Sequence, residues 1–101
     1  MENKYAVKLL PRAYRDLDGI YAYIAETLIE PGIASELVDL LEESIFSLER
    51  MPQRGALRKM GTYANRRYRQ IFEGNFTVLY RVDEAKKEVI IVTVRYSKSE
   101  F

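Results

Sequence analysis

The spacing of the apolar residues changes midway along the chain, and this change limits the folds that are open to it. Between residues 11 and 48, apolar side chains recur at intervals of three and four, the period of a helix with one buried face. From residue 67 onward they alternate with other side chains or form a β-branched run, which is typical of strands. The two patterns together predict an α+β domain in which helices cover one face of a sheet.

The first half of the chain predicts a short strand followed by two helices. Residues 5–9 have the period of a strand, and Pro11 suits the first turn of a helix, where its missing N–H costs little. Pro31 and Gly32 separate the two helical segments so closely that we expect an antiparallel helical hairpin, and Pro52 ends the second helix. The two apolar stripes consist of Leu17, Ile20, Ile24 and Leu28, and of Ala34, Leu37, Leu41, Ile45 and Leu48.

The second half predicts three further strands, at residues 67–72, 76–82 and 89–94, joined by polar turns. The last of them is apolar on both faces, so we expect it to lie at the centre of the sheet or to be well covered. The element order is therefore β-α-α-β-β-β, which predicts one α+β domain over residues 1–101. Its small, twisted, antiparallel-rich sheet would pack against the N-terminal helical hairpin.

The composition excludes several kinds of site. The chain contains no cysteine and no histidine, so it has no disulfide, no thiolate or imidazole metal ligand, and no Ser-His-Asp or Cys-His nucleophile. We therefore expect neither a metal nor a cofactor. No apolar run reaches the roughly 18 residues of a membrane helix, and the N-terminus lacks the apolar region of a secretory signal. These features favour the cytoplasm and no contact with a membrane.

Charge is divided unevenly along the chain. Residues 1–49 carry four basic and ten acidic side chains, whereas residues 50–101 carry twelve basic and five acidic ones. A basic half of this kind predicts contact with a polyanion or with an acidic protein segment. The candidate contact residues are Arg54, Arg58, Lys59, Arg66, Arg67, Arg69 and Arg81, with Arg95 and Lys98 as possible additions and Tyr63, Tyr68 and Tyr96 interleaved.

Guanidinium groups bind phosphates bidentately, and aromatic rings stack on unpaired bases, so this set suits nucleic acid as well as protein. The open alternative is a basic surface that contacts only water. For Arg81 the alternatives are a functional cation in a shallow concavity or an ion pair with Asp83 or Glu88. The acidic residues of the helices have no spacing that supports a metal site, and we expect them to lie in solvent: Asp16, Asp18, Asp39, Glu42 and Glu43.

The chain resembles the RelE/ParE superfamily of toxins from bacterial type II toxin–antitoxin modules, which serve in plasmid stabilisation. The resemblance covers nearly the whole chain, and the order and spacing of its pieces make it specific. The matching pieces are Leu9-Leu10-Pro11-Arg12-Ala13, Arg15-Asp16-Leu17, Ile20, Tyr23-Ile24-Ala25-Glu26, Leu48, Met51-Pro52, Arg54-Gly55, residues 75–83 (NFTVLYRVD), Val89-Ile90-Ile91-Val92 and Arg95-Tyr96-Ser97.

The resemblance implies a small growth inhibitor that a cognate antitoxin neutralises, often in a hetero-oligomeric complex. Antitoxins of this kind drape a partly disordered segment over the toxin, and an acidic amphipathic helix would complement the basic surface.

The superfamily contains two mechanisms. RelE-like members cleave mRNA on the ribosome with Arg, Lys and a C-terminal Tyr or His, whereas ParE-like members poison DNA gyrase. At the positions where RelE-like enzymes carry catalytic side chains, this chain has Tyr68, Gln70, Thr77 and Ser97. A nuclease site would therefore need Arg69, Arg81, Arg95, Tyr96 or Lys98 in new roles. These substitutions favour the gyrase poison over the nuclease, and a non-toxic nucleic-acid or protein-binding module is a third alternative.

Overall fold

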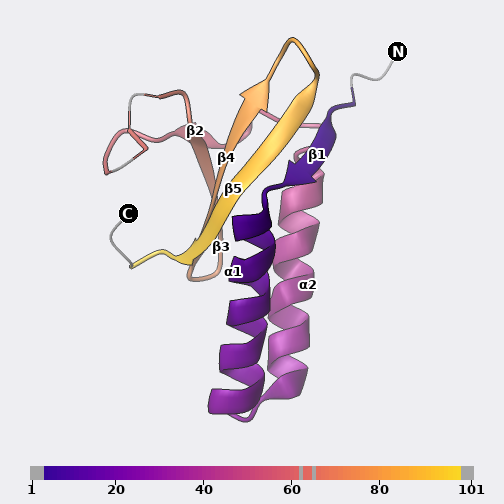
Figure 1. Cartoon of the computed structure of the whole chain (residues 1–101), viewed down its shortest axis with the longest axis vertical. Helices are drawn as coiled ribbons and strands as arrows, with labels where there is room; N and C mark the ends of the chain where they lie inside the picture. The colour runs from indigo at the N-terminus through magenta and orange to yellow at the C-terminus, as the bar shows by residue number, and fades with distance from the viewer. Residues whose placement is uncertain (1–3, 62, 65, 99–101) are drawn as a thin grey trace.

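The computed structural model describes residues 4–61, 63–64 and 66–98, and in it two helices pack against one five-stranded sheet (Figure 1). The strand order is β1-β5-β4-β3-β2, with β1 parallel to β5 and the other neighbours antiparallel. The elements are β1 (Ala6–Leu9), α1 (Pro11–Ala22), a π-helical turn (Tyr23–Thr27), α2 (Pro31–Ser47), β2 (Ala56–Leu57), β3 (Arg69–Glu73), β4 (Phe76–Asp83) and β5 (Glu88–Tyr96). The α+β class and the predicted element order are confirmed, and the two-residue strand β2 is an addition.

Both helices begin as their prolines predict, because Pro11 and Pro31 each occupy the first turn. The first helix does not run regularly to the loop, however. Its last turn is π-helical, with the Leu28 N–H donating to the Tyr23 carbonyl at 3.2 Å. Ile29 follows with φ of 53°, a left-handed conformation that β-branched residues rarely adopt. The tip of the hairpin is therefore irregular and strained, which periodicity alone does not predict.

The core lies between the hairpin and the sheet. Leu41 and Ile45 of α2, and Leu48 directly after it, are fully buried against a layer of strand residues that includes Val78, Tyr80, Val89 and Ile91. The central position predicted for residues 89–94 is confirmed, since β5 lies between β1 and β4 and both of its faces are buried.

The hairpin is longer than the sheet that it covers. In Figure 1 both helices continue well past the end of the sheet at which β5 ends. The apolar stripe of α1 continues into this overhang, where Ile20 and Ile24 are only partly buried and Leu28 is 52% exposed. The overhang therefore presents apolar side chains that no strand covers.

Asp16 corrects the expectation that the helical carboxylates lie in solvent. The β1 strand leaves the edge of β5 at Leu10, whose N–H donates to the Ile91 carbonyl. Beyond that point Asp16 of α1 takes its place, because its carboxylate accepts hydrogen bonds from the Val94 N–H (3.1 Å) and from the Thr93 hydroxyl. Asp16 therefore satisfies a strand edge that would otherwise lack a partner.

Candidate functional site

Two of the predicted contact arginines hold the fold together. Arg69 of β3 donates to the carbonyls of Gly55 (2.7 Å) and Gln53 (3.3 Å), while Arg54 donates to the Ser44 carbonyl and the Ser47 hydroxyl at the end of α2. The loop after α2 is thus tied to β3 on one side and to α2 on the other. These contacts occupy donors that the sequence had suggested for a phosphate or an acidic partner.

Tyr80 lies under this loop and accounts for its close approach to the sheet. The buried Tyr80 hydroxyl accepts a hydrogen bond from the Gly55 N–H at 3.0 Å. Burial raises the pKa of Tyr80 above its ordinary value, against the opposing effects of the Gly55 N–H and the guanidinium groups of Arg69 and Arg54. A Cβ atom at Gly55 would lie 2.6 Å from both the Tyr80 hydroxyl and the Gln70 carbonyl, so only glycine fits there.

On the sheet face away from the helices, the loop and three strands form a shallow basic concavity of about 460 Å³. Its described lining residues are Ala56, Leu57, Arg58, Lys59, Met60, Gln70, Phe72, Thr77 and Ser97. The positions that the resemblance to RelE-like enzymes marked as replaced, at residues 70, 77 and 97, thus meet in this one place.

The chemistry of the basic concavity is that of a neutral hydrogen-bonded surface beside two cations. The Thr77 and Ser97 hydroxyls bond each other at 2.8 Å, and Arg58 donates to the Gln70 side chain at 2.8 Å and to the Met60 carbonyl at 2.9 Å. Among the described residues that line it, none is a carboxylate, an imidazole or a phenol. The concavity therefore has groups that can attract an anion but no evident acid or base.

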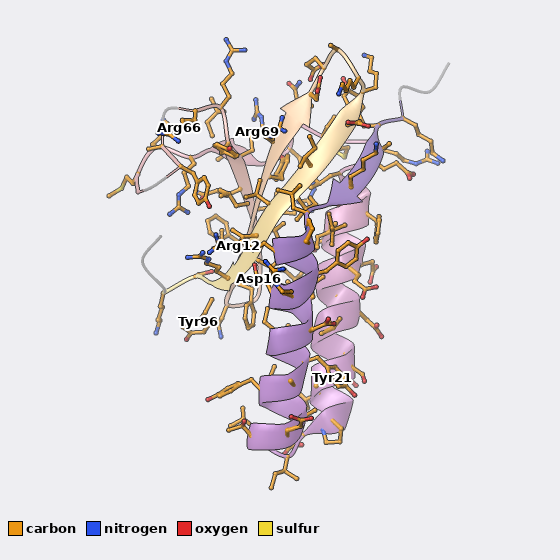
Figure 2. The ribbon with its side chains drawn as sticks, in the orientation of Figure 1. Arg12, Asp16, Tyr21, Arg66, Arg69 and Tyr96 are labelled. Carbon is orange, nitrogen blue, oxygen red and sulfur yellow. The ribbon has the colours of Figure 1, made fainter. Side chains whose placement is uncertain are left out.

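The remaining predicted residues do not line the basic concavity, although Arg95 pairs with Thr77 across β4 and β5 and Lys98 follows Ser97. Arg81 is exposed on β4, four residues after Thr77. The carboxylates expected as its partners have other contacts: Glu88 forms an ion pair with Lys8, and Asp83 accepts a hydrogen bond from the Lys86 N–H. Arg66 and Arg67 are exposed on the loop before β3, and Figure 2 shows Arg66 well away from the hairpin. Arg95 of β5 is partly buried and Lys98 is exposed.

Tyr96 turns to the helix side of the sheet, as strand alternation predicts for the neighbour of Ser97. Its ring packs edge-on against Phe76, with 5.8 Å between the ring centroids. Figure 2 shows it at the end of β5, on the same side of α1 as Asp16. Tyr63 and Tyr68 form a similar edge-on pair at 5.0 Å within the basic loop region.

Tyr96 and Phe76 form one wall of an open apolar groove of about 790 Å³ between the hairpin overhang and the end of the sheet. The other wall is formed by Ile20, Tyr23, Ile24, Leu28 and Leu37, and the charged side chains of Arg15 and Asp16 also line the groove. Tyr23 and Leu28 are more than half exposed, and so is the neighbouring Ile29 at the strained tip. Contiguous exposed apolar surface on this scale marks a site of protein contact.

The apolar groove was not predicted from the sequence. The stripe of Ile20, Ile24 and Leu28 was predicted as part of the helix face that packs against the sheet. The available signal was length: the two helices are much longer than the strands that they cover, so a part of each stripe has to extend past the sheet.

Two further observations bear on the kind of site. Among the described residues, no cluster of carboxylate side chains is arranged to hold a metal ion. No helix within the described part of the chain is long and apolar enough to cross a membrane.

Comparison with known proteins identifies the family to which the chain is similar. The model of the ParE toxin of the type II toxin–antitoxin system parDE matches residues 7–101. No curated protein sequence matches the chain. A solved structure of the chromosomal ParDE system from P. aeruginosa is similar, with a TM-score of 0.76, 24% identity and coverage of 96% of this chain and 100% of that one.

Two RelE-type structures share the fold. The RelBE2 toxin–antitoxin complex from Mycobacterium tuberculosis has a TM-score of 0.61 and 24% identity, and covers 92% of this chain and 98% of that one. A mutant of the E. coli toxin RelE in the free state has a TM-score of 0.64 and 15% identity, with coverage of 94% and 85%. Because the family model spans nearly the whole chain, the protein belongs to the ParE family of type II toxins.

Proposed function

We propose that this toxin arrests growth in the cytoplasm by binding a protein target, with DNA gyrase as the leading candidate, and that a cognate antitoxin neutralises it. The proposal combines family membership with the chemistry of the basic concavity. The family supplies the toxin role, and the concavity favours binding over RNA cleavage.

The observation that carries the proposal is the hydrogen bond between Thr77 and Ser97. A metal-independent ribonuclease has to deprotonate a 2′-hydroxyl, stabilise the crowded phosphate and protonate the leaving oxygen. Arg58 and Lys59 suit the second task, but two hydroxyls that satisfy each other suit neither proton transfer, since the pKa of an unperturbed serine or threonine is far from neutrality. The concavity is therefore a poor nuclease site.

The apolar groove is the proposed antitoxin site. An antitoxin helix or extended segment with apolar side chains would cover Ile24, Leu28 and Tyr96 and complete the core beyond the sheet. Acidic residues on the same segment would meet Arg15. Since such a segment folds on binding, it would cover a large area and remain replaceable after proteolysis.

The test of the target is a supercoiling assay with purified gyrase and the purified full-length toxin. We expect the toxin to inhibit supercoiling or to accumulate cleaved DNA, and an equimolar amount of antitoxin to restore activity. Full supercoiling activity at toxin concentrations that arrest growth in cells would reject gyrase as the target.

The second candidate function, ribosome-dependent mRNA cleavage, has one observation in its favour: Arg58 and Lys59 lie together in the basic concavity. An enzyme that uses them for the phosphate would lose toxicity in an Arg58→Ala variant while still binding antitoxin. Our proposal predicts that Arg58→Ala stays toxic at equal protein levels.

A further inference from the structure

The hairpin carries a second hollow, between α1 and α2, on the side of α1 away from the apolar groove. It has a volume of about 290 Å³ and is lined by Tyr14, Asp18 and Tyr21 of α1 and by Val38, Glu42 and Phe46 of α2, above Leu9 and Leu17. Figure 2 shows Tyr21 at the junction of the two helices, whereas Asp16 and Tyr96 lie on the other side of α1. We call this feature the aromatic–acidic hollow.

Both of its walls follow from helical spacing. Tyr14, Asp18 and Tyr21 lie at i, i+4 and i+7 on α1, and Val38, Glu42 and Phe46 lie at i, i+4 and i+8 on α2. One exposed stripe of each helix thus faces the other across the hollow. The same turns direct Leu17 and Leu41 into the core, so the hollow is built on a rigid support.

The three rings of the hollow are unusually open to solvent, with Tyr14 58%, Tyr21 41% and Phe46 50% exposed. Three large rings gathered on one surface indicate a contact site more strongly than single exposed apolar residues do. In the described part of the chain, neither Asp18 nor Glu42 forms an ion pair. The hollow therefore offers ring faces and unpaired carboxylates together.

This combination selects a cation. A guanidinium or ammonium group is attracted to the face of an aromatic ring, and a carboxylate accepts its hydrogen bonds. The hairpin around the hollow is also negatively charged, because residues 11–47 contain two arginines against eight carboxylates. The volume lies at the lower limit of small-molecule pockets, which start at roughly 300 Å³. It suits one long basic side chain with its apolar neighbours.

We infer that the aromatic–acidic hollow is the surface with which the toxin holds its target, and that it receives an Arg- or Lys-bearing segment of that protein. The inference rests on the proposed function, since it names the surface that arrests growth. The proposed antitoxin site is the apolar groove, whose described lining carries one cation, Arg15, and one carboxylate, Asp16, which is hydrogen-bonded to β5. Among the described residues, the hollow is lined by two carboxylates and no cation, so it selects a basic segment, whereas the groove selects an apolar one. We therefore assign the two surfaces to different partners.

The test is a charge reversal in the full-length toxin. The Asp18→Lys/Glu42→Lys variant places two cations in the hollow, and the Asp39→Lys/Glu43→Lys variant makes the same change at exposed positions of α2 outside it. Both are induced without antitoxin, and viable counts are compared at equal toxin levels measured by immunoblot. We expect the hollow variant to need at least about 30-fold more protein for the same arrest, the loss typical of a central contact. The control should match wild type.

Three further measurements distinguish a lost target contact from a loss of folding or of antitoxin binding. Circular dichroism has to show the same melting behaviour for both charge-reversal variants, and their affinity for the purified cognate antitoxin has to equal that of wild type. Tyr21→Phe, which keeps the ring face, should retain toxicity, whereas Tyr21→Leu should lose about fivefold or more.

Undiminished arrest by the hollow variant would overturn the inference while leaving the proposed function intact. A loss of antitoxin affinity in that variant would also overturn it, because the hollow would then belong to the antitoxin. A wild-type protein that does not arrest growth would instead reject the proposed function, and the inference with it.

Discussion

The same substitution at two positions of the hairpin distinguishes its core from its open groove. Leu41 is fully buried under the sheet, and Leu28 is 52% exposed on the overhang. Leu41→Ala and Leu28→Ala remove identical atoms from the same pair of helices. Any difference between them therefore reports the surroundings of each side chain.

The expected magnitudes follow from burial. Leu41→Ala loses the transfer free energy of a buried side chain and leaves a closed cavity, which together cost about 3–5 kcal/mol. At Leu28 about half of the side chain already contacts water, and the open groove leaves no cavity, so we expect a loss of roughly 0.5 kcal/mol. If the antitoxin covers Leu28, its affinity should fall about five- to tenfold, or roughly 1 kcal/mol.

The assay is urea unfolding of each purified variant without antitoxin, followed by calorimetric titration with the cognate antitoxin. A constant m-value will show that the unfolded state is unchanged. A loss above about 2 kcal/mol for Leu28→Ala would show that the apolar groove is closed in the free toxin. A loss below about 1 kcal/mol for Leu41→Ala would show that this face of α2 does not form the core, and unchanged antitoxin affinity of Leu28→Ala would place the antitoxin elsewhere.

Three further predictions concern stability. Asp16→Ala removes the acceptor for the Val94 N–H and should lower the free energy of unfolding in urea by about 1–3 kcal/mol, with Asp16→Asn between this variant and the wild type. Equal stability of the wild type and both variants would show that solvent replaces the carboxylate. Gly55→Ala should cost about 1–3 kcal/mol or more through its clash with Tyr80, and a neutral result would mean that the loop shifts freely. The Tyr5 hydroxyl is the main cause that lowers the pKa of Glu84 below its ordinary 4.5, so this stabilisation is present above pH 4.5 and is lost as the pH falls through the lower folded value. In the Glu84→Gln variant the free energy of unfolding should depend less on pH below about 4.5 than in the wild type. The same pH dependence in both proteins would show that Glu84 does not cause it.

The elements of the fold could be predicted because their signals are local. The prolines at residues 11 and 31 mark helix starts, and the alternation of residues 76–82 marks a strand with one buried face. Boundaries were less predictable, since β3 begins at Arg69 rather than at residue 67, where Arg67 adopts φ of 63°. The strained Ile29 and the π-helical turn belong to the connection between the two helices, and apolar spacing does not encode the conformation of that connection.

The candidate sites depend on contacts between distant segments, so the sequence indicated them only in part. The replaced nuclease positions were identified from the resemblance, but the hydrogen bond between Thr77 and Ser97 needed the pairing of β4 with β5. Charge alone could not separate Arg69, which ties down the loop, from Arg66, which is exposed. Asp16 likewise reads as one more helical carboxylate until the end of β1 is known.

The most direct test of growth arrest by protein binding is primer extension on ribosome-associated mRNA soon after the toxin is induced without antitoxin. We predict intact mRNA, with no new 5′ ends, in cells that have stopped dividing. Discrete new 5′ ends within codons, absent from an uninduced culture and from an Arg58→Ala control, would contradict this mechanism and identify the basic concavity as a nuclease site.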